Sequence, residues 1–346
     1  MSAFFATIGL PEVLAGVIVL ALNAYVLMGG ADYGGGVWDL LASGPRRDAQ
    51  RELIATSIAP IWEANHVWLI VVVVMTFTAF PSVYATLATV LHIPLTLLLV
   101  GIVLRGSAFV IRSYGKHSTA ARRRWGLAFA IASIVSPVLL GMTIGALASG
   151  GVAAASARTA NGSFVSVYVE SWLNVFTVSV GLFALALFAF LAAVYLAVAA
   201  QEASLRDDFR RRALAAAVVV FVLAAIALLS ARSEAPQIAH GVMGTSWAIV
   251  LHLCTAVAAI VALVALWRRQ FRTARVAAAA QVSLILWGWA FAQYPFVVPP
   301  TLTIDGAAAP RITLDLLSIG LVIGAAILLP SLRYLFRIFA RPASLP

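Results

Sequence analysis

The chain has 346 residues, of which 63% are hydrophobic and only 10% are charged, whereas a soluble domain carries roughly 25% charged residues. Its apolar runs reach about 20 residues, enough to cross roughly 30 Å of hydrocarbon, and they lack the alternation of β-barrel strands. We therefore predict an all-α polytopic membrane protein. The net charge of +10 does not indicate nucleic-acid binding, because the basic residues fall in short loops between apolar runs.

The single cysteine and the first apolar run exclude two further classes. Cys254 lies inside an apolar run and has no second cysteine to pair with, which rules out an intrachain disulfide and a thiolate metal cluster. The first run follows no basic region and is too long for a signal peptide, so we expect a retained helix.

Nine membrane spans are predicted within a single integral membrane domain covering residues 1–346. Their approximate limits are 11–38, 53–79, 82–111, 126–149, 173–200, 213–231, 245–266, 276–297 and 314–336. The loops on one side hold 19 arginine and lysine residues and those on the other side hold three. Because positive charge is retained in the cytoplasm, this asymmetry predicts an N-out, C-in topology, which requires an odd number of spans.

Three of these spans carry an ionisable residue in their cytoplasmic half. At 1.5 Å per residue, Glu63 of the second span lies roughly 16 Å from the inner loop, and Asp32 of the first and Arg105 of the third each lie about 10 Å in. An ionisable group at such depth costs several kcal/mol and is a functional candidate by default. The three together suggest a polar path from the cytoplasm to mid-membrane.

A structural ion pair is the alternative for these charges. Arg105 would neutralise one carboxylate and lock the helices together, since buried charges normally pair; we expect its partner to be Asp32 or a carboxylate of another subunit. Such a pair would leave one of the two acids, Asp32 and Glu63, without a cationic partner. Burial favours the protonated form of that acid, which would let it exchange protons near neutral pH.

The residues around the two acids are also unusual. His66 follows Glu63 by three residues on the same helix face, and it could act as a relay partner, a haem or metal ligand, or a packing residue. Pro60 weakens the helix one turn before Glu63. The glycine-rich run 29–36 follows a membrane span, whereas a dinucleotide-binding loop follows a strand, so we reject that interpretation. We expect the glycines to permit close helix packing around Asp32.

These segments resemble subunit II of the cytochrome bd quinol oxidase family. The carrying sequences are Gly30-Ala-Asp-Tyr-Gly-Gly-Gly36 in span one, Ser57-Ile-Ala-Pro-Ile-Trp-Glu-Ala-Asn-His-Val-Trp68 in span two, Arg105 in span three and Tyr294-Pro-Phe-Val-Val-Pro299 near the end of span eight. The match runs from span one to span nine, in order and at similar spacing. Some members have aspartate at the position of Glu63, glutamine at His66 and a further aspartate at Gly29.

The resemblance implies a complex that oxidises quinol and reduces dioxygen to water. Subunit I would carry the b-type and d-type haems, and this chain would ligate no haem or metal. The chain would form two four-helix bundles plus one peripheral helix, deliver protons and stabilise the haem-bearing subunit. The implied proton-pathway residues are Glu63, Asp32 and Arg105, supported by His66, Asn65, Trp62 and Trp68.

The implied setting is the inner membrane of a bacterial or archaeal cell. Expected partners are the haem-bearing subunit I, membrane lipid and quinone, and no nucleic acid. Whether a small single-span subunit or a structurally bound quinone is present stays open.

Two other functions compete with the oxidase. A proton-coupled secondary transporter should show broken helices in matching positions of two halves, and the glycine run and Pro60 have no clear counterpart in spans five to eight. A purely structural membrane anchor leaves Asp32 and Glu63 unexplained.

Overall fold

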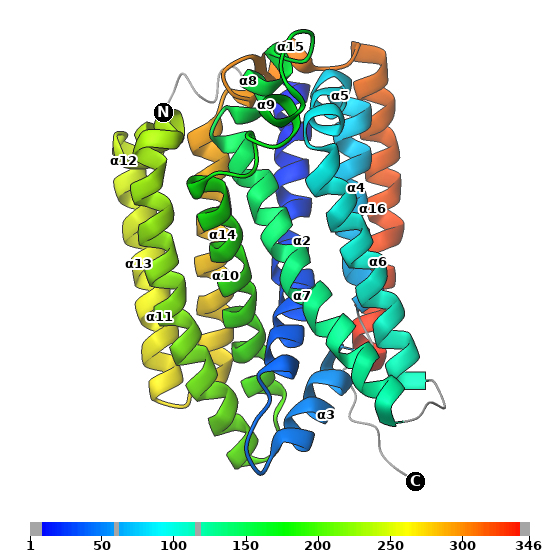
Figure 1. The fold of residues 1–346 in the computed structure, drawn as a ribbon, viewed down its shortest axis with the longest axis vertical. Helices are drawn as coiled ribbons and strands as arrows, with labels where there is room; N and C mark the ends of the chain where they lie inside the picture. Colours follow the sequence, from blue (N-terminus) through cyan, green and yellow to red (C-terminus); the bar gives the residue numbers. More distant parts are fainter. Residues whose placement is uncertain (1–8, 59–61, 115–118, 340–346) are drawn as a thin grey trace.

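The computed structural model describes the backbone of residues 9–58, 62–114 and 119–339, and the side chains of this part except at 58, 62–64, 112–114, 119–123 and a few positions beyond 335. Long helices run side by side along the longest axis of the molecule (Figure 1). Within the described part, eight helices are long and apolar enough to cross a membrane, or up to nine if a bent helix pair counts as one span. The prediction of an all-α polytopic membrane protein is confirmed to this extent.

The elements fall into two groups by length. The long apolar helices are α2 (Leu10–Leu40), α6 (His92–Tyr114), α7 (Thr119–Ala148), α10 (Val175–Ala199), α11 (Ala203–Glu234), α13 (Ser246–Trp267), α14 (Phe271–Gln293) and α16 (Arg311–Phe339). The shorter elements are α3 (Arg47–Ile58), α4 (Trp62–Ala79), α5 (Pro81–Val90), α8 (Gly151–Ala157), α9 (Phe164–Tyr168), α12 (Pro236–Met243), β1 (Phe296–Val298), β2 (Leu302–Thr303) and α15 (Ile304–Ala307).

The region predicted as spans two and three is divided more finely than expected. The predicted span 53–79 is made of α3 and α4, and the predicted span 82–111 is made of α5 and α6. α5 has 10 residues, which reach about 15 Å and cannot cross the bilayer. It is bent by 116° from the described part of α4. Pro81 begins α5 because it has no N–H with which to continue α4.

The predicted end of span eight is also wrong. α14 ends at Gln293, and the chain then forms a two-stranded antiparallel sheet in which Phe296 pairs with Thr303. Pro295 cannot donate a helical hydrogen bond. The side-chain Nε2 of Gln293 instead donates to the carbonyl of Val297 at 2.8 Å, which stabilises the turn out of the helix.

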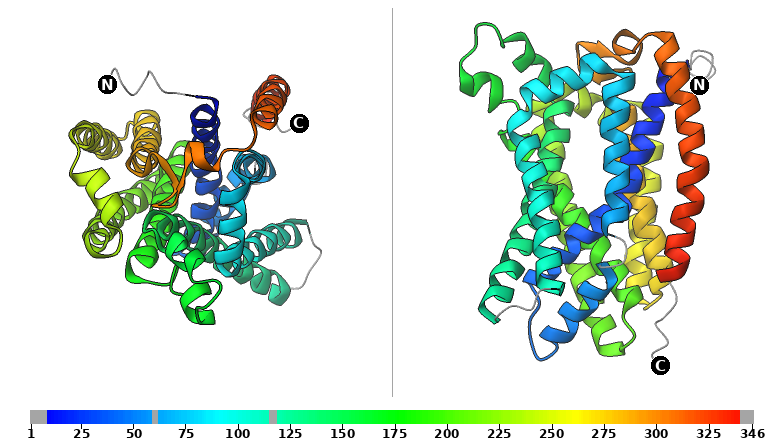
Figure 2. Two further views of the ribbon diagram at one scale, coloured as in Figure 1. Left: turned by 90° about the horizontal axis from the view of Figure 1, so that it is seen from above. Right: turned by 90° about the vertical axis from the view of Figure 1, so that its right-hand side faces the viewer.

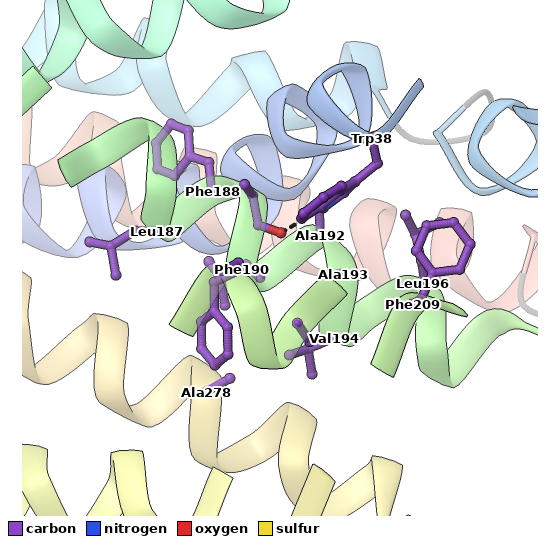
Figure 3. Packing of buried hydrophobic residues seen from close by; sticks show 14 of the residues in the cluster. Trp38, Leu187, Phe188, Phe190, Ala192, Ala193, Val194, Leu196, Phe209 and Ala278 are labelled. Carbon is purple, nitrogen blue, oxygen red and sulfur yellow. Dashed lines mark hydrogen bonds between the residues drawn. The ribbon is translucent and has the colours of Figure 1, made fainter. Parts of the chain in front are cut away.

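α10 lies at the centre of the molecule and packs against α2, α7, α11 and α14. The Trp38 indole of α2 donates to the carbonyl of Ala189 in α10 at 2.8 Å, and its ring lies beside Ala192 (Figure 3). α16 has little contact with the other helices, with only 6% of its apolar window buried, and it stands at the edge of the molecule seen from above (Figure 2).

The two ends of the molecule differ in kind. α5, α8, α9 and α15 gather at one end, whereas α3 and the α13–α14 turn lie at the other (Figure 1). Ion pairs join elements at that second end: Arg46 binds Asp208 at 2.6 Å, and Arg269 binds Asp207 at 3.0 Å. The arginines of the loops at this end therefore also hold α3, α11 and the α13–α14 turn together.

Candidate functional site

Asp32 of α2 and Asn65 of α4 meet in the interior. Asn65 donates a hydrogen bond from Nδ2 to a carboxylate oxygen of Asp32 at 2.5 Å. Asn65 is 0% exposed and Asp32 is 4% exposed. A buried carboxyl group needs such a donor, because burial without a hydrogen bond costs several kcal/mol. The structure thus brings together two residues that the sequence singled out on separate spans.

Two tyrosines of α2 belong to the same buried region. The hydroxyl groups of Tyr25 and Tyr33 lie 3.1 Å apart, and both residues are at most 1% exposed. The sequence reasoning missed them as site residues because an aromatic residue in an apolar run usually indicates packing. The signal was spacing: Tyr25 precedes Asp32 by seven residues, which puts both on one face of a helix.

Arg105 of α6 is buried against aromatic rings and a hydroxyl group. Its guanidinium carbon lies 4.7 Å from the ring centroid of Tyr33 and 5.2 Å from that of Phe129, and its Nε donates to Ser133 Oγ at 3.1 Å. Arg105 is 2% exposed, and its Nη2 has no hydrogen-bond partner among the described residues. Stacking on aromatic faces suits the planar guanidinium group.

The expected ion pair between Arg105 and Asp32 is not formed. Both side chains are described, and the ion pairs within 4.0 Å found among the described residues do not include this one. Arg105 nevertheless lies over the ring of Tyr33, the residue that follows Asp32 in α2. Its positive charge is therefore held close to the acid by aromatic packing and Ser133 rather than by a direct salt bridge.

His66 of α4 lies beside the tyrosine pair. Its ring centroid is 6.0 Å from that of Tyr25 and 6.4 Å from that of Tyr33, and the residue is partly buried. Trp68 packs on the same hydrophobic core, and its Nε1 is buried with no hydrogen-bond partner in the described part. His66 therefore lies beside the buried tyrosine pair, and Trp68 packs on the surrounding core.

The side chains of Glu63 and Trp62 lie outside the described residues, as does Pro60. Both Glu63 and Trp62 belong to α4, and Glu63 precedes His66 by three residues, which puts the two positions on one helix face.

We call Tyr25, Asp32, Tyr33, Asn65, His66, Arg105 and Ser133 the buried polar cluster.

Glycines in α2 bring this cluster close to its neighbours. A Cβ atom at Gly34 would overlap the backbone carbonyl of Phe188, and one at Gly36 would overlap the side chain of Ser133. α2 can therefore approach α10 and α7 only because these positions lack side chains. The prediction that the glycine run permits close packing around Asp32 is confirmed.

Among the described residues, no group of three or more His, Cys, Asp or Glu side chains could hold a metal ion. The cluster instead offers hydroxyl, amide, carboxyl, imidazole and guanidinium groups within a helical core. Such groups can donate, accept and relay protons.

The family model for cytochrome bd terminal oxidase subunit II matches residues 10–339, nearly the whole chain. The chain belongs to this family. Its cytochrome bd relatives include a provisionally named menaquinol oxidase subunit II of Bacillus subtilis (strain 168), 24% identical over 337 residues, or 92% of each chain. A cytochrome bd-I ubiquinol oxidase subunit 2 of Escherichia coli (strain K12) is 34% identical over 105 residues, which cover 30% of this chain and 27% of that protein.

The fold agrees with the family. A chain of the bd oxidase from Geobacillus thermodenitrificans superposes with a TM-score of 0.78, covering 95% of this chain and 98% of that one at 20% identity. This cytochrome bd subunit II is therefore a multi-pass membrane subunit of a respiratory quinol oxidase. The oxidase hypothesis is confirmed over the transporter and the structural anchor.

Proposed function

We propose that this subunit conducts protons from the cytoplasm toward the oxygen-reducing centre of its complex and stabilises the haem-bearing subunit. The observation that carries this proposal is the buried contact between Asp32 and Asn65, with the charge of Arg105 nearby. Oxygen reduction to water consumes protons, so a membrane-embedded oxidase needs groups that carry them inward.

Each residue of the proposed path has a distinct task. Glu63 accepts the proton deepest in the membrane, and Asp32 relays it. Arg105 places a buried positive charge beside the ring of Tyr33, the residue that follows Asp32. Asn65 orients the Asp32 carboxyl group through their hydrogen bond, while Trp62, His66 and Trp68 shape the surroundings of Glu63.

The redox centres belong to the partner in this proposal. Subunit I carries the b-type haems and the d-type haem, which supply the electron transfer and oxygen chemistry, and quinol is the electron donor. The names of the relatives from Escherichia coli and Bacillus subtilis, which are ubiquinol and menaquinol oxidase subunits, support quinol as the substrate. The residues of this chain hold and move protons.

The proposed topology has nine spans with the N-terminus outside and the C-terminus inside a bacterial or archaeal inner membrane. Two features support it: the 19-to-3 division of basic residues between the loops, and the opposite ends of the molecule at which α2 begins and α16 ends (Figure 1). In this topology residues 1–346 form one membrane domain. α2, α4, α6 and α7 make one four-helix bundle, α10, α11, α13 and α14 make the other, and α16 is peripheral.

The division of tasks between the subunits is tested by absorption spectroscopy. We expect the complex purified with its partner to show the bands of b-type and d-type haems, and this chain purified alone to be colourless. His66→Ala is the matched variant, because His66 is the histidine of the buried polar cluster. A haem band in the lone subunit that disappears in His66→Ala would contradict the assignment of the haems to the partner.

A further inference from the structure

A groove runs along the outer surface of α13 and α14, two helices that contribute no residue to the buried polar cluster. Its volume is about 540 Å³, and its lining is almost entirely apolar. The lining includes Leu253, Cys254 and Val261 from α13 and Thr273, Val276 and Leu284 from α14.

The length of the groove matches one leaflet of a bilayer. Thr273 and Leu284 are separated by eleven residues of helix, or roughly 16 Å along the axis. Half of a hydrocarbon core of about 30 Å is ~15 Å. An acyl chain that enters from one membrane surface would therefore follow the groove to mid-membrane.

Arginines stand at the membrane-surface end of this groove. Arg268 directly follows the end of α13, seven residues after Val261, and Arg272 lies in the first turn of α14, directly before Thr273. Both arginines are exposed. Trp267, the last residue of α13, is 75% exposed, as expected of an aromatic residue at the membrane interface.

These two arginines are available to an anion. Among the described residues, neither Arg268 nor Arg272 takes part in an ion pair within 4.0 Å, whereas their neighbour Arg269 is held by Asp207 at 3.0 Å. A guanidinium group matches a phosphate through two parallel N–H donors. An apolar groove therefore lies next to two exposed arginines that form no ion pair within the described part of the chain.

We propose that this groove binds an anionic phospholipid, with one acyl chain along α13 and α14 and the phosphate at Arg268 and Arg272. We choose a phospholipid over a quinone because Arg268 and Arg272 lie at the end of the groove. A phospholipid has an anionic phosphate to bind them, whereas a quinone has none. This site goes beyond the proton role and does not depend on it.

The native cysteine reports on the groove directly. Cys254 is the only cysteine of this chain and is exposed in the groove. In the purified complex in neutral detergent, the rate of Cys254 alkylation by N-ethylmaleimide is followed by mass spectrometry of its peptide. Dioleoylphosphatidylglycerol or dioleoylphosphatidylcholine is then titrated in. We expect the anionic lipid to slow alkylation at much lower concentration, since each arginine near an anionic headgroup contributes about fivefold in affinity.

Paired charge variants separate the headgroup from general charge effects. Arg268→Gln with Arg272→Gln should raise the phosphatidylglycerol concentration for half-protection by roughly 25-fold, two fivefold steps. Arg333→Gln with Arg337→Gln is the control, because it removes two exposed charges from α16 at the same end of the molecule. Equal protection of Cys254 by the two lipids, or protection by neither lipid, would overturn the proposal. So would a Cys254 that does not react even without lipid, because a partner helix would then cover the groove.

Discussion

Asp32 shows how the neighbours of a buried carboxyl group determine what it can do. Asp32 is 4% exposed and accepts a hydrogen bond from Asn65, and it forms no ion pair within 4.0 Å among the described residues. The proposed proton role of Asp32 depends on this arrangement, because a carboxylate in a direct salt bridge would hold its charge.

Arg105 is the residue whose replacement distinguishes a charge effect from simple packing. Arg105→Leu removes two aromatic contacts and the bond to Ser133, together worth on the order of 3 kcal/mol. We expect lower yield of the assembled complex and slower turnover. Arg105→Lys keeps the charge and should retain more turnover than Arg105→Leu at equal haem content.

The measurements are complex yield by size-exclusion chromatography and oxygen consumption per haem. Normal yield and turnover of Arg105→Leu would mean that the guanidinium group neither packs the core nor acts on Asp32.

The sequence predicted the site residues better than their contacts. Asp32 and Arg105 stood out because charged groups are costly inside a membrane, and Asn65 was implied by the resemblance in span two. Tyr25, Tyr33 and Ser133 did not, because hydroxyl-bearing residues are common in apolar helices. The aromatic contacts of Arg105 depend on how α6 packs against α2 and α7, which residue spacing within single spans cannot reveal.

At the scale of the helices, run length predicted the regular spans well. The predicted spans 173–200 and 245–266 correspond to Val175–Ala199 and Ser246–Trp267. The prediction was wrong where apolar composition continues through a change of direction. The segment 81–111 is mostly apolar, but its first ten residues form the bent helix α5. The turn after Gln293 likewise keeps an apolar sequence while it forms β1.

The close approach of α2 and α10 makes Gly34 a test of the helix packing. Gly34→Ala places a methyl group against the carbonyl of Phe188, and overpacking against rigid backbone costs about 1–3 kcal/mol. We expect the complex to lose its monodisperse peak at a lower temperature after heating and size-exclusion chromatography.

Gly16→Ala is the matched control in the same helix. A Cβ atom there would meet nothing within 4 Å, and alanine favours a helix by up to ~1 kcal/mol over glycine. Its thermal midpoint should equal or exceed that of the wild type. Equal midpoints for Gly34→Ala and Gly16→Ala would contradict the close packing of α2 on α10.

At the scale of the whole molecule, the subunit is a helical scaffold with one buried polar cluster at the junction of α2, α4, α6 and α7. Its outer helices are different: only 17% of the apolar windows of α11 and α13 and 6% of that of α16 are buried. Such surfaces suit lipid and other subunits. In the proposed function, the chain's part in proton delivery depends on the few polar residues at that junction.

Steady-state oxygen consumption by complexes of matched haem content tests the proton role most directly. Glu63→Gln keeps the shape and hydrogen-bonding capacity of the side chain but cannot exchange a proton, so we expect quinol-driven turnover to fall by roughly 100-fold with assembly intact. Asp32→Asn should also slow turnover, Glu63→Asp should retain much of it, and Glu52→Gln, at an exposed position of α3, should be unchanged. Wild-type turnover in both Glu63→Gln and Asp32→Asn would mean that protons reach the oxygen-reducing centre by another route.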